Sequence, residues 1–252
     1  RFHLRPILRA VTFPHDCYIL AVGMGAVRLI EVSADLPPYP VKVADFPKDM
    51  ADAIGRRSHS ARSGQMRGAE ASSENALLTR YARVLDEALR PVLSGQERPL
   101  IVAAAEPMAS IFRSVSTYPF TVNETLGGSA DHTADHILAA EARSVLDRLY
   151  AAEIAALAGL YVTRENQGRA TTDLAQAARA ATFGAIDSMI VDMDAVIPGS
   201  IDDEDGKLSF ADAPGADSYG VVDEIVSRAL KSGARVIAAR KDDVPGKGVL
   251  AA

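Results

Sequence analysis

Apolar and polar residues in the first half of the chain are arranged as expected for two strands, a long helix and a third strand. Apolar, β-rich runs lie on both sides of Gly23-Met24-Gly25, so we expect an antiparallel hairpin over residues 17–32. From Ala69 to Leu93 apolar residues recur at three- and four-residue spacing, which predicts an amphipathic helix. The continuous apolar run at 100–105 is typical of a buried strand, and a further helix is expected from Glu106 to Val115.

The long predicted helix has an apolar and a polar face. Before it we expect a rigid, proline-rich connector at 36–40, an extended piece at 41–43 and a helical turn at 46–54. Pro91 lies near its end, and Ser94-Gly95 terminates it. We assign Ala76, Leu77, Tyr81, Val84, Leu85, Ala88 and Leu89 to the apolar face, and Arg80, Arg83, Asp86, Glu87 and Arg90 to the polar face.

In the second half, helices and strands alternate, which implies parallel strands with right-handed crossovers. Gly127-Gly128-Ser129 is the clearest linker and divides the chain into predicted domains at 1–128 and 129–252. Thr171 or Thr172 is the expected cap of the second helix of this half. In order, we expect helices at 133–160, 173–182 and 219–231, strands at 185–192 and 234–240, and an acidic, glycine-bearing insertion at 198–215.

Composition places the chain among ordinary soluble proteins, with 48% hydrophobic and 24% charged residues. The single cysteine, Cys17, excludes an internal disulfide framework and fits a reducing cytosol, so we expect a cytoplasmic protein with a buried thiol. No apolar run approaches the roughly 20 residues that a membrane span needs, so no membrane partner is expected. The chain opens with Arg1 and stops within an apolar run, and we expect it to be part of a longer protein.

The net charge of −6 is unevenly distributed. Residues 55–69 contain four arginines (Arg56, Arg57, Arg62 and Arg67) and no acid, whereas residues 187–224 contain eleven acids against Lys207 alone. A basic segment on an acidic protein can contact a polyanion locally without general affinity for nucleic acid. A solvated arginine-rich loop explains the charge pattern equally well.

The tripeptide Ser63-Gly64-Gln65 leads directly into the long helix, which contains Arg80-Tyr81-Ala82-Arg83-Val84. Residues 100–106 then form a strand that ends in small residues, and the second half follows with Phe183-Gly184-Ala185-Ile186-Asp187 and Gly233-Ala234. This order of parts resembles the last two domains of the archaeal and eukaryotic class-1 peptide-chain release factor and Pelota family, above all its bacterial branch. The resemblance implies an α/β fold, with an RNase H-like middle domain followed by an α/β/α domain of the kink-turn-RNA-binding type.

In that family the loop reads Gly-Gly-Gln and enters the peptidyl-transferase centre, where the glutamine backbone helps to orient a water against the ester of peptidyl-tRNA. The resemblance therefore assigns catalytic positions to Gln65 and Gly64, and RNA contacts to Arg56, Arg57, Arg62, Ser63, Arg67 and Gly68. Ser63 stands where the first glycine is expected, and serine resists the positive-φ backbone that glycine allows. Whether the chain hydrolyses peptidyl-tRNA is left open, but Ser63 favours binding over hydrolysis.

The leading hypothesis is a release-factor-like protein whose partners are the ribosome and its ribosomal RNA or tRNA, acting in ribosome rescue, quality control or hibernation. A peptidyl-tRNA ester hydrolase that uses Gln65 is the first alternative. A translational GTPase is left open as a further partner, and no cofactor is expected. The alternative of another class is an RNA-binding or protein-interaction module that acts without the ribosome.

Other arrangements of acids and histidines suggest metal sites, but simpler explanations are available. A nuclease would need clustered carboxylates, and Asp16, Asp35 and Glu106 are the candidates at strand ends. His132 and His136 have a spacing that can bind zinc, but Asp131 or Thr133 as a helix cap explains that segment. Residues 202–206 lack the spacing of a calcium loop and are expected to form an acidic, solvated turn, so we predict no metal.

Overall fold

The computed structural model describes residues 12–58, 70–128, 131–212 and 219–252. It has a mixed α/β fold and forms two compact units, which are described separately below. The first unit comprises His15–Asp147, and the second comprises Arg148–Ala252 with the described residues before His15. Helix α5 (Asp135–Glu165) runs through the point of division, and the expected domain limits at 128 and 129 stay a prediction.

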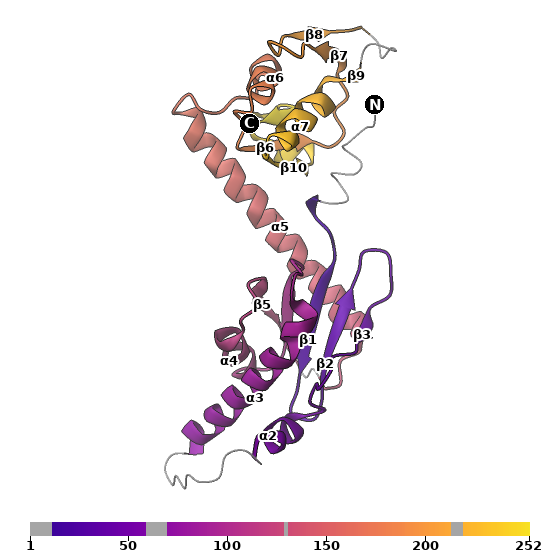
Figure 1. The fold of residues 1–252 in the computed structure, drawn as a ribbon, viewed down its shortest axis with the longest axis vertical. Coiled ribbons are helices and arrows are strands. Elements are labelled where there is room, and N and C mark those ends of the chain that lie inside the picture. The colour runs from indigo at the N-terminus through magenta and orange to yellow at the C-terminus, as the bar shows by residue number, and fades with distance from the viewer. Residues whose placement is uncertain (1–11, 59–69, 129–130, 213–218) are drawn as a thin grey trace. The chain divides into compact units, whose positions relative to one another are not determined.

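The first unit is built on a mixed five-stranded sheet (Figure 1). The expected hairpin is confirmed, because β1 and β2 pair antiparallel with Val22 opposite Val27, whereas β1 and β4 are parallel. Pro40 lies in the edge strand β3, where the missing N–H costs no ladder bond to a further strand. In spatial order the strands are β3 (Tyr39–Val41), β2 (Val27–Val32), β1 (Cys17–Val22), β4 (Leu100–Ala103) and β5 (Thr121–Leu126).

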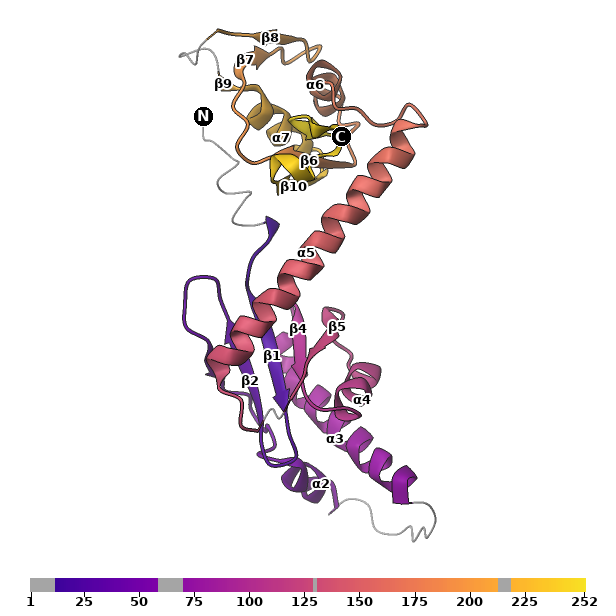
Figure 2. The ribbon, with the colours of Figure 1, turned by 180° about the vertical axis from the view of Figure 1, so that it is seen from behind.

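Helices cover both faces of this sheet (Figure 2). On one face α3 (Glu70–Leu93) and α4 (Met108–Val115) bury a core that includes Tyr18, Leu20, Leu29, Tyr81, Leu85 and Phe112. The first half of α5 crosses the other face, where the alternate residues of β1 point, and Leu138, Ala142 and Leu146 of that half are buried. Cys17 is buried as expected, and burial raises the pKa of its thiol to about 12.

The long helix expected over 69–93 is confirmed, but its inward face is rotated from the one assigned above. Leu78 and Ala82 are buried, whereas Leu77 is 42% exposed. The assignment of Asp86 to the polar face was wrong, because its carboxylate is buried and accepts hydrogen bonds from the Thr117 backbone N–H (2.7 Å) and hydroxyl. That partner lies 31 positions away, so helical periodicity alone cannot indicate it.

The second unit contains a three-stranded sheet in the order β10-β6-β11. The predicted parallel pair is confirmed in β6 (Ser188–Asp192) and β10 (Arg235–Ala239), and β11 (Leu250–Ala251) joins β6 antiparallel. Helices α6 (Leu174–Thr182) and α7 (Val221–Lys231) share a core with this sheet. The cap of α6 was wrongly assigned to Thr171 or Thr172, because the Asp173 carboxylate accepts the N–H of Gln176. Two short 3-10 helices, at Lys241–Asp243 and Pro245–Lys247, follow β10.

The acidic insertion forms a second, antiparallel sheet that the sequence did not indicate. Its strands are β7 (Pro198–Ile201), β8 (Leu208–Phe210) and β9 (Tyr219–Gly220), in the order β8-β7-β9. The expected solvated turn is confirmed between β7 and β8, where residues 202–205 are exposed. No helix within the described ranges is both long and apolar enough to cross a membrane.

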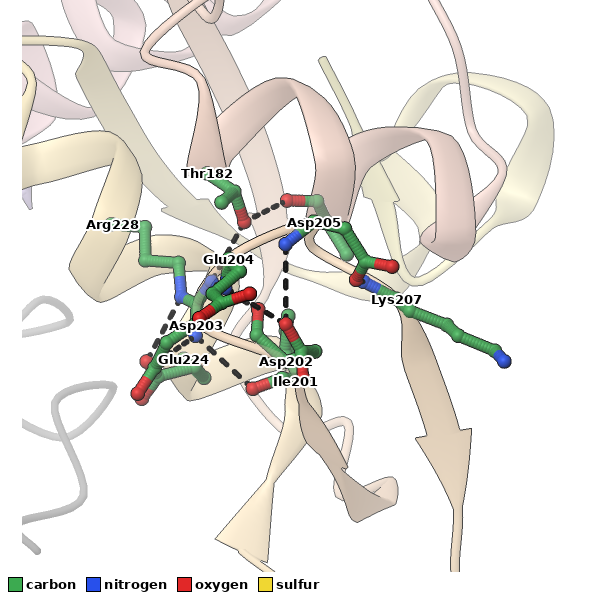
Figure 3. Close-up of polar contacts among 10 residues, drawn as sticks. Thr182, Ile201, Asp202, Asp203, Glu204, Asp205, Lys207, Glu224 and Arg228 are labelled. Atoms are coloured by element: carbon green, nitrogen blue, oxygen red, sulfur yellow. Dashed lines mark hydrogen bonds and ion pairs between the residues drawn. The ribbon is translucent and has the colours of Figure 1, made fainter.

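Arg228 of α7 attaches this turn to the second unit (Figure 3). Only 10% of its side chain is exposed, and it has hydrogen-bond acceptors on three elements. Within the turn, the backbone N–H groups of Glu204 and Asp205 donate to Asp202 and hold the pKa of that carboxyl below its usual range. The acceptors for Arg228 are the Thr182 hydroxyl, the Ile201 and Asp202 carbonyls, and the Asp203 and Glu224 carboxylates.

Replacing Arg228→Met is expected to lower the free energy of unfolding of this unit by about 3 kcal/mol, because it removes a largely buried cation together with its hydrogen bonds to Glu224, Thr182 and the Ile201 carbonyl. Urea denaturation followed by circular dichroism measures the change. Lys231→Met, at an exposed position of the same helix, is the control and should change the value by less than about 0.5 kcal/mol. Equal losses in both variants would contradict the role assigned to Arg228.

Candidate functional site

The predicted functional segment lies between two helices. Arg56 and Arg57 belong to the last turn of α2 (Met50–Ser58), and α3 begins at Glu70. The expected helical turn before the basic segment therefore exists, although it begins four residues later than predicted. The remaining predicted site residues, Arg62, Ser63, Gly64, Gln65, Arg67 and Gly68, lie outside the described residues.

Local hydrogen bonds explain why α2 begins where it does. The Asp49 carboxylate accepts the N–H of Asp52 (2.7 Å), which is the usual bond of a helix N-cap. The Asp52 carboxylate in turn accepts the N–H of Lys48 (3.0 Å), so the pair resembles a capping box. The start of α2 is therefore determined by its own sequence.

The turn between β1 and β2 holds both helices. The Met24 carbonyl accepts the N–H of Met50, the first residue of α2 (3.2 Å). The Gly23 carbonyl accepts the hydroxyl of Tyr81 on α3 (3.2 Å). Tyr81 is fully buried, and burial, followed by the negative charges of Asp131 and Asp49, raises the pKa of its phenol, which therefore remains a neutral donor.

A third contact joins the two helices directly. Nη2 of Arg80 on α3 donates to the carbonyl oxygen of Ile54 on α2 (3.2 Å). Arg80 was assigned to the polar face of α3, and the structure uses that position to reach the neighbouring helix. Arg80 thus joins α3 to α2, and the next residue, Tyr81, joins α3 to the hairpin turn.

Asp131 also contacts the hairpin turn. Its Oδ2 lies 3.5 Å from the Gly25 nitrogen, and its Oδ1 is buried with no hydrogen-bond partner among the described residues. A Cβ atom at Gly23 would lie 1.8 Å from Oδ1, so any other residue at this position would require the Asp131 carboxylate to move. Asp131, one of two residues expected to cap α5, therefore contacts the hairpin instead. Arg28 of β2 fixes the same segment through Asp135 (2.8 Å).

Gly23→Ala is expected to destabilise the first unit by about 2 kcal/mol, because the added methyl group must displace the Asp131 carboxylate. Gly25→Ala is the matched control, since the nearest described atom to its Cβ position is 3.9 Å away. Chemical denaturation of both variants measures the difference. The double variant Gly23→Ala/Asp131→Ala should recover most of the loss, and failure to do so would show that Asp131 is not the obstacle.

The rival metal sites are not assembled in the structure. Asp16 accepts the N–H of Ala34 (2.9 Å) and Glu106 accepts the N–H of Ser110 (3.2 Å), so each serves its own loop or helix end. Across the described part of the chain, no group of three or more His, Cys, Asp or Glu side chains is arranged to hold a metal ion. The nuclease and zinc hypotheses thus gain no support from geometry.

Comparison with protein families gives one match over most of the first unit. The family model of the bacterial archaeo-eukaryotic release factor family 11 matches residues 14–152, which is more than half of the chain and includes α2, α3 and the segment between them. The chain belongs to this family. The family assignment made from the order of parts is therefore confirmed. The comparison with curated proteins gave no match.

Solved structures of similar proteins come from yeast and archaea. Dom34 of S. cerevisiae, described as a translation termination-like factor involved in RNA quality control pathways and interacting with Hbs1, is 10% identical over 89% of this chain, with a TM-score of 0.48. Pelota of Archaeoglobus fulgidus is 15% identical over 99% of this chain, with a TM-score of 0.37, and Pelota of Thermoplasma acidophilum is 14% identical over 96%, with a TM-score of 0.32. The match covers 57%, 66% and 64% of those chains respectively, so this chain spans less than two thirds of each.

Sequence reasoning missed the contacts that hold the flanking helices. The pattern identified Gly23-Met24-Gly25 only as the turn of a hairpin, and Tyr81 only as part of the apolar face of its helix. The paired glycines were the available signal, because glycine in a strand-turn region often marks a close approach of other groups to the backbone. The residues that approach, Tyr81 and Asp131, come from distant parts of the sequence.

Proposed function

We propose that this protein is a translation factor that binds the ribosome, through ribosomal RNA or tRNA, with the arginine-rich segment 56–68. The observation that carries this proposal is membership of the release factor family, because the matched region contains that segment and both helices beside it. Ribosome rescue, quality control or hibernation is the activity that we favour. A translational GTPase is a further proposed partner.

The electrostatics of the segment support RNA binding. Arg56, Arg57, Arg62 and Arg67 carry four positive charges without an intervening acid, on a chain of net charge −6. Arginine contacts phosphate oxygens in a bidentate manner, and such contacts position a protein on RNA. The acidic remainder of the chain disfavours RNA elsewhere, so binding is confined to this segment.

Ser63 is the reason for favouring a factor that does not hydrolyse peptidyl-tRNA. A glycine at this position would allow positive φ and close approach of the backbone to RNA, whereas serine disfavours both. Gly64 and Gln65 retain the rest of the family motif, so the segment keeps its binding contacts while losing the geometry proposed for catalysis.

The fold is proposed in more detail on the same basis. We propose an RNase H-like architecture for the first unit, supported by its mixed five-stranded sheet with helices on both faces. For the second unit we propose the kink-turn-RNA-binding type of α/β/α fold, supported by the parallel β6–β10 pair and its helices. Binding of kink-turn RNA itself is not part of the proposal.

Sedimentation with ribosomes at moderate salt tests the binding proposal. The wild type is expected to pellet with ribosomes, and the variant with Arg56, Arg57, Arg62 and Arg67 all changed to Glu should bind at least roughly a hundredfold more weakly, because four phosphate contacts become repulsive. The control carries the same charge change at four exposed arginines elsewhere (Arg83, Arg169, Arg179 and Arg240) and should pellet nearly as the wild type does.

A wild type that stays in the supernatant would remove the translation proposal. An RNA-binding or protein-interaction module that acts without the ribosome would then be the better description. Equal weakening of the two quadruple variants would show that total charge, and not this segment, determines binding.

Peptide release from stalled ribosomes tests for hydrolysis. We expect the wild type and Gln65→Ala to release peptide only at the background rate, because Ser63 removes the glycine geometry on which water positioning depends. Binding to ribosomes is measured in the same samples, so that absence of release is not confused with absence of binding. Release by the wild type that is lost in Gln65→Ala would instead identify a peptidyl-tRNA hydrolase.

A further inference from the structure

Three hydrogen bonds form a closed ring that joins α2, α3 and the turn between β1 and β2. The ring runs from Tyr81 on α3 to the Gly23 carbonyl, and from the next carbonyl, at Met24, to the first N–H of α2. It continues along α2 to Ile54 and returns through the Arg80 guanidinium to α3. The ring fixes α2 and α3 to each other, and these are the two helices between which residues 59–69 lie in the sequence.

Arg80 is the member of the ring that acts on the end of α2. Ile54 lies four residues before the last residue of that helix, so Arg80 holds the part of α2 that leads into its last turn. A guanidinium that donates to this carbonyl joins α2 to α3, and as a cation near the C-terminal end of α2 it also interacts favourably with the helix dipole. That last turn contains Arg56 and Arg57.

We propose that Arg80 is a positioning residue for RNA binding: it fixes α2 to α3 and thereby sets the position of the end of α2, which carries Arg56 and Arg57. This inference rests on the proposed function. Arg80 itself does not need to touch RNA, because its described donor contact is with the Ile54 carbonyl. Its effect on binding therefore passes through the two arginines of α2.

Arg80→Gln tests the proposal in the full chain. Ribosome affinity should fall about tenfold, the size expected from loss of one charge-assisted hydrogen bond that orders the binding groups. The dependence of log affinity on log salt should also become shallower, by roughly one phosphate contact, which a uniform loss of folded protein would not produce. Arg80→Lys, which keeps the cation near the helix end, should restore part of both.

The matched control is Arg83→Gln, which removes the same charge from an exposed position one turn further along α3. Its affinity and salt dependence should equal those of the wild type. Amide hydrogen exchange provides a readout that does not involve the ribosome: the last turn of α2 should exchange faster in Arg80→Gln and unchanged in Arg83→Gln.

A double-mutant cycle separates positioning from direct contact. In the background Arg56→Gln/Arg57→Gln, adding Arg80→Gln should cause no further loss of affinity, because the groups that it positions are already absent. Additive losses would overturn the proposal and show that Arg80 contacts RNA by itself. Wild-type affinity and exchange in Arg80→Gln would also overturn it.

The same cycle distinguishes failure of this inference from failure of the proposed function. If Arg56→Gln/Arg57→Gln binds ribosomes as the wild type does, the RNA-binding segment itself is wrongly assigned. If that variant is weakened but Arg80→Gln is not, the segment is correct and only the positioning role is wrong.

Discussion

The absence of a side chain at Gly23 is the constraint on which the first unit depends. Because no Cβ lies there, the Asp131 carboxylate can close on one side of the hairpin turn while the Tyr81 hydroxyl reaches its carbonyl. The next carbonyl in the turn receives the first N–H of α2. One short turn therefore contacts the first residue of α2, Tyr81 of α3 and the Asp131 side chain. Among the described residues, the buried Oδ1 of Asp131 has no hydrogen-bond partner, which is the energetic cost of this arrangement.

Charge is used differently in the two units. In the first, positive charge gathers in the last turn of α2 and in the segment that follows it. In the second, acids gather around the β7–β8 turn, where Arg228 compensates some of them and joins the turn to α6 and α7. The acidic turn is thus fixed by one largely buried cation, while most of its carboxylates face solvent. Positive charge is thus concentrated in and after the last turn of α2, whereas acids dominate residues 187–224.

Family membership and local geometry bear on different parts of the functional question. Membership indicates translation, and it covers the segment that contains Ser63, Gly64 and Gln65. Geometry describes the two helices on which that segment is mounted, and it shows that they are held by backbone carbonyls at three points. These three contacts hold α2 and α3 in the same relative position whatever the sequence of the segment between them. A serine in place of the first glycine can therefore change the chemistry of the segment while its mounting is retained.

The sequence by itself determined the elements whose causes are local. Apolar periodicity predicted the β1–β2 hairpin, α3 and the β6–α7–β10 unit. The Asp49–Asp52 capping pair, which explains why α2 begins at Met50 and not at residue 46, is also local but was not recognised from the sequence. The tertiary structure alone decided the burial of Asp86, the β7–β8–β9 sheet and the reach of Arg80 to Ile54. Those features depend on partners that are distant in sequence. Thr117 donates the hydrogen bonds that allow Asp86 to be buried, and the short strands β7, β8 and β9 are stable only when paired with one another. An arginine on a polar helix face has many possible acceptors until the fold places one beside it, as it places the Ile54 carbonyl beside Arg80.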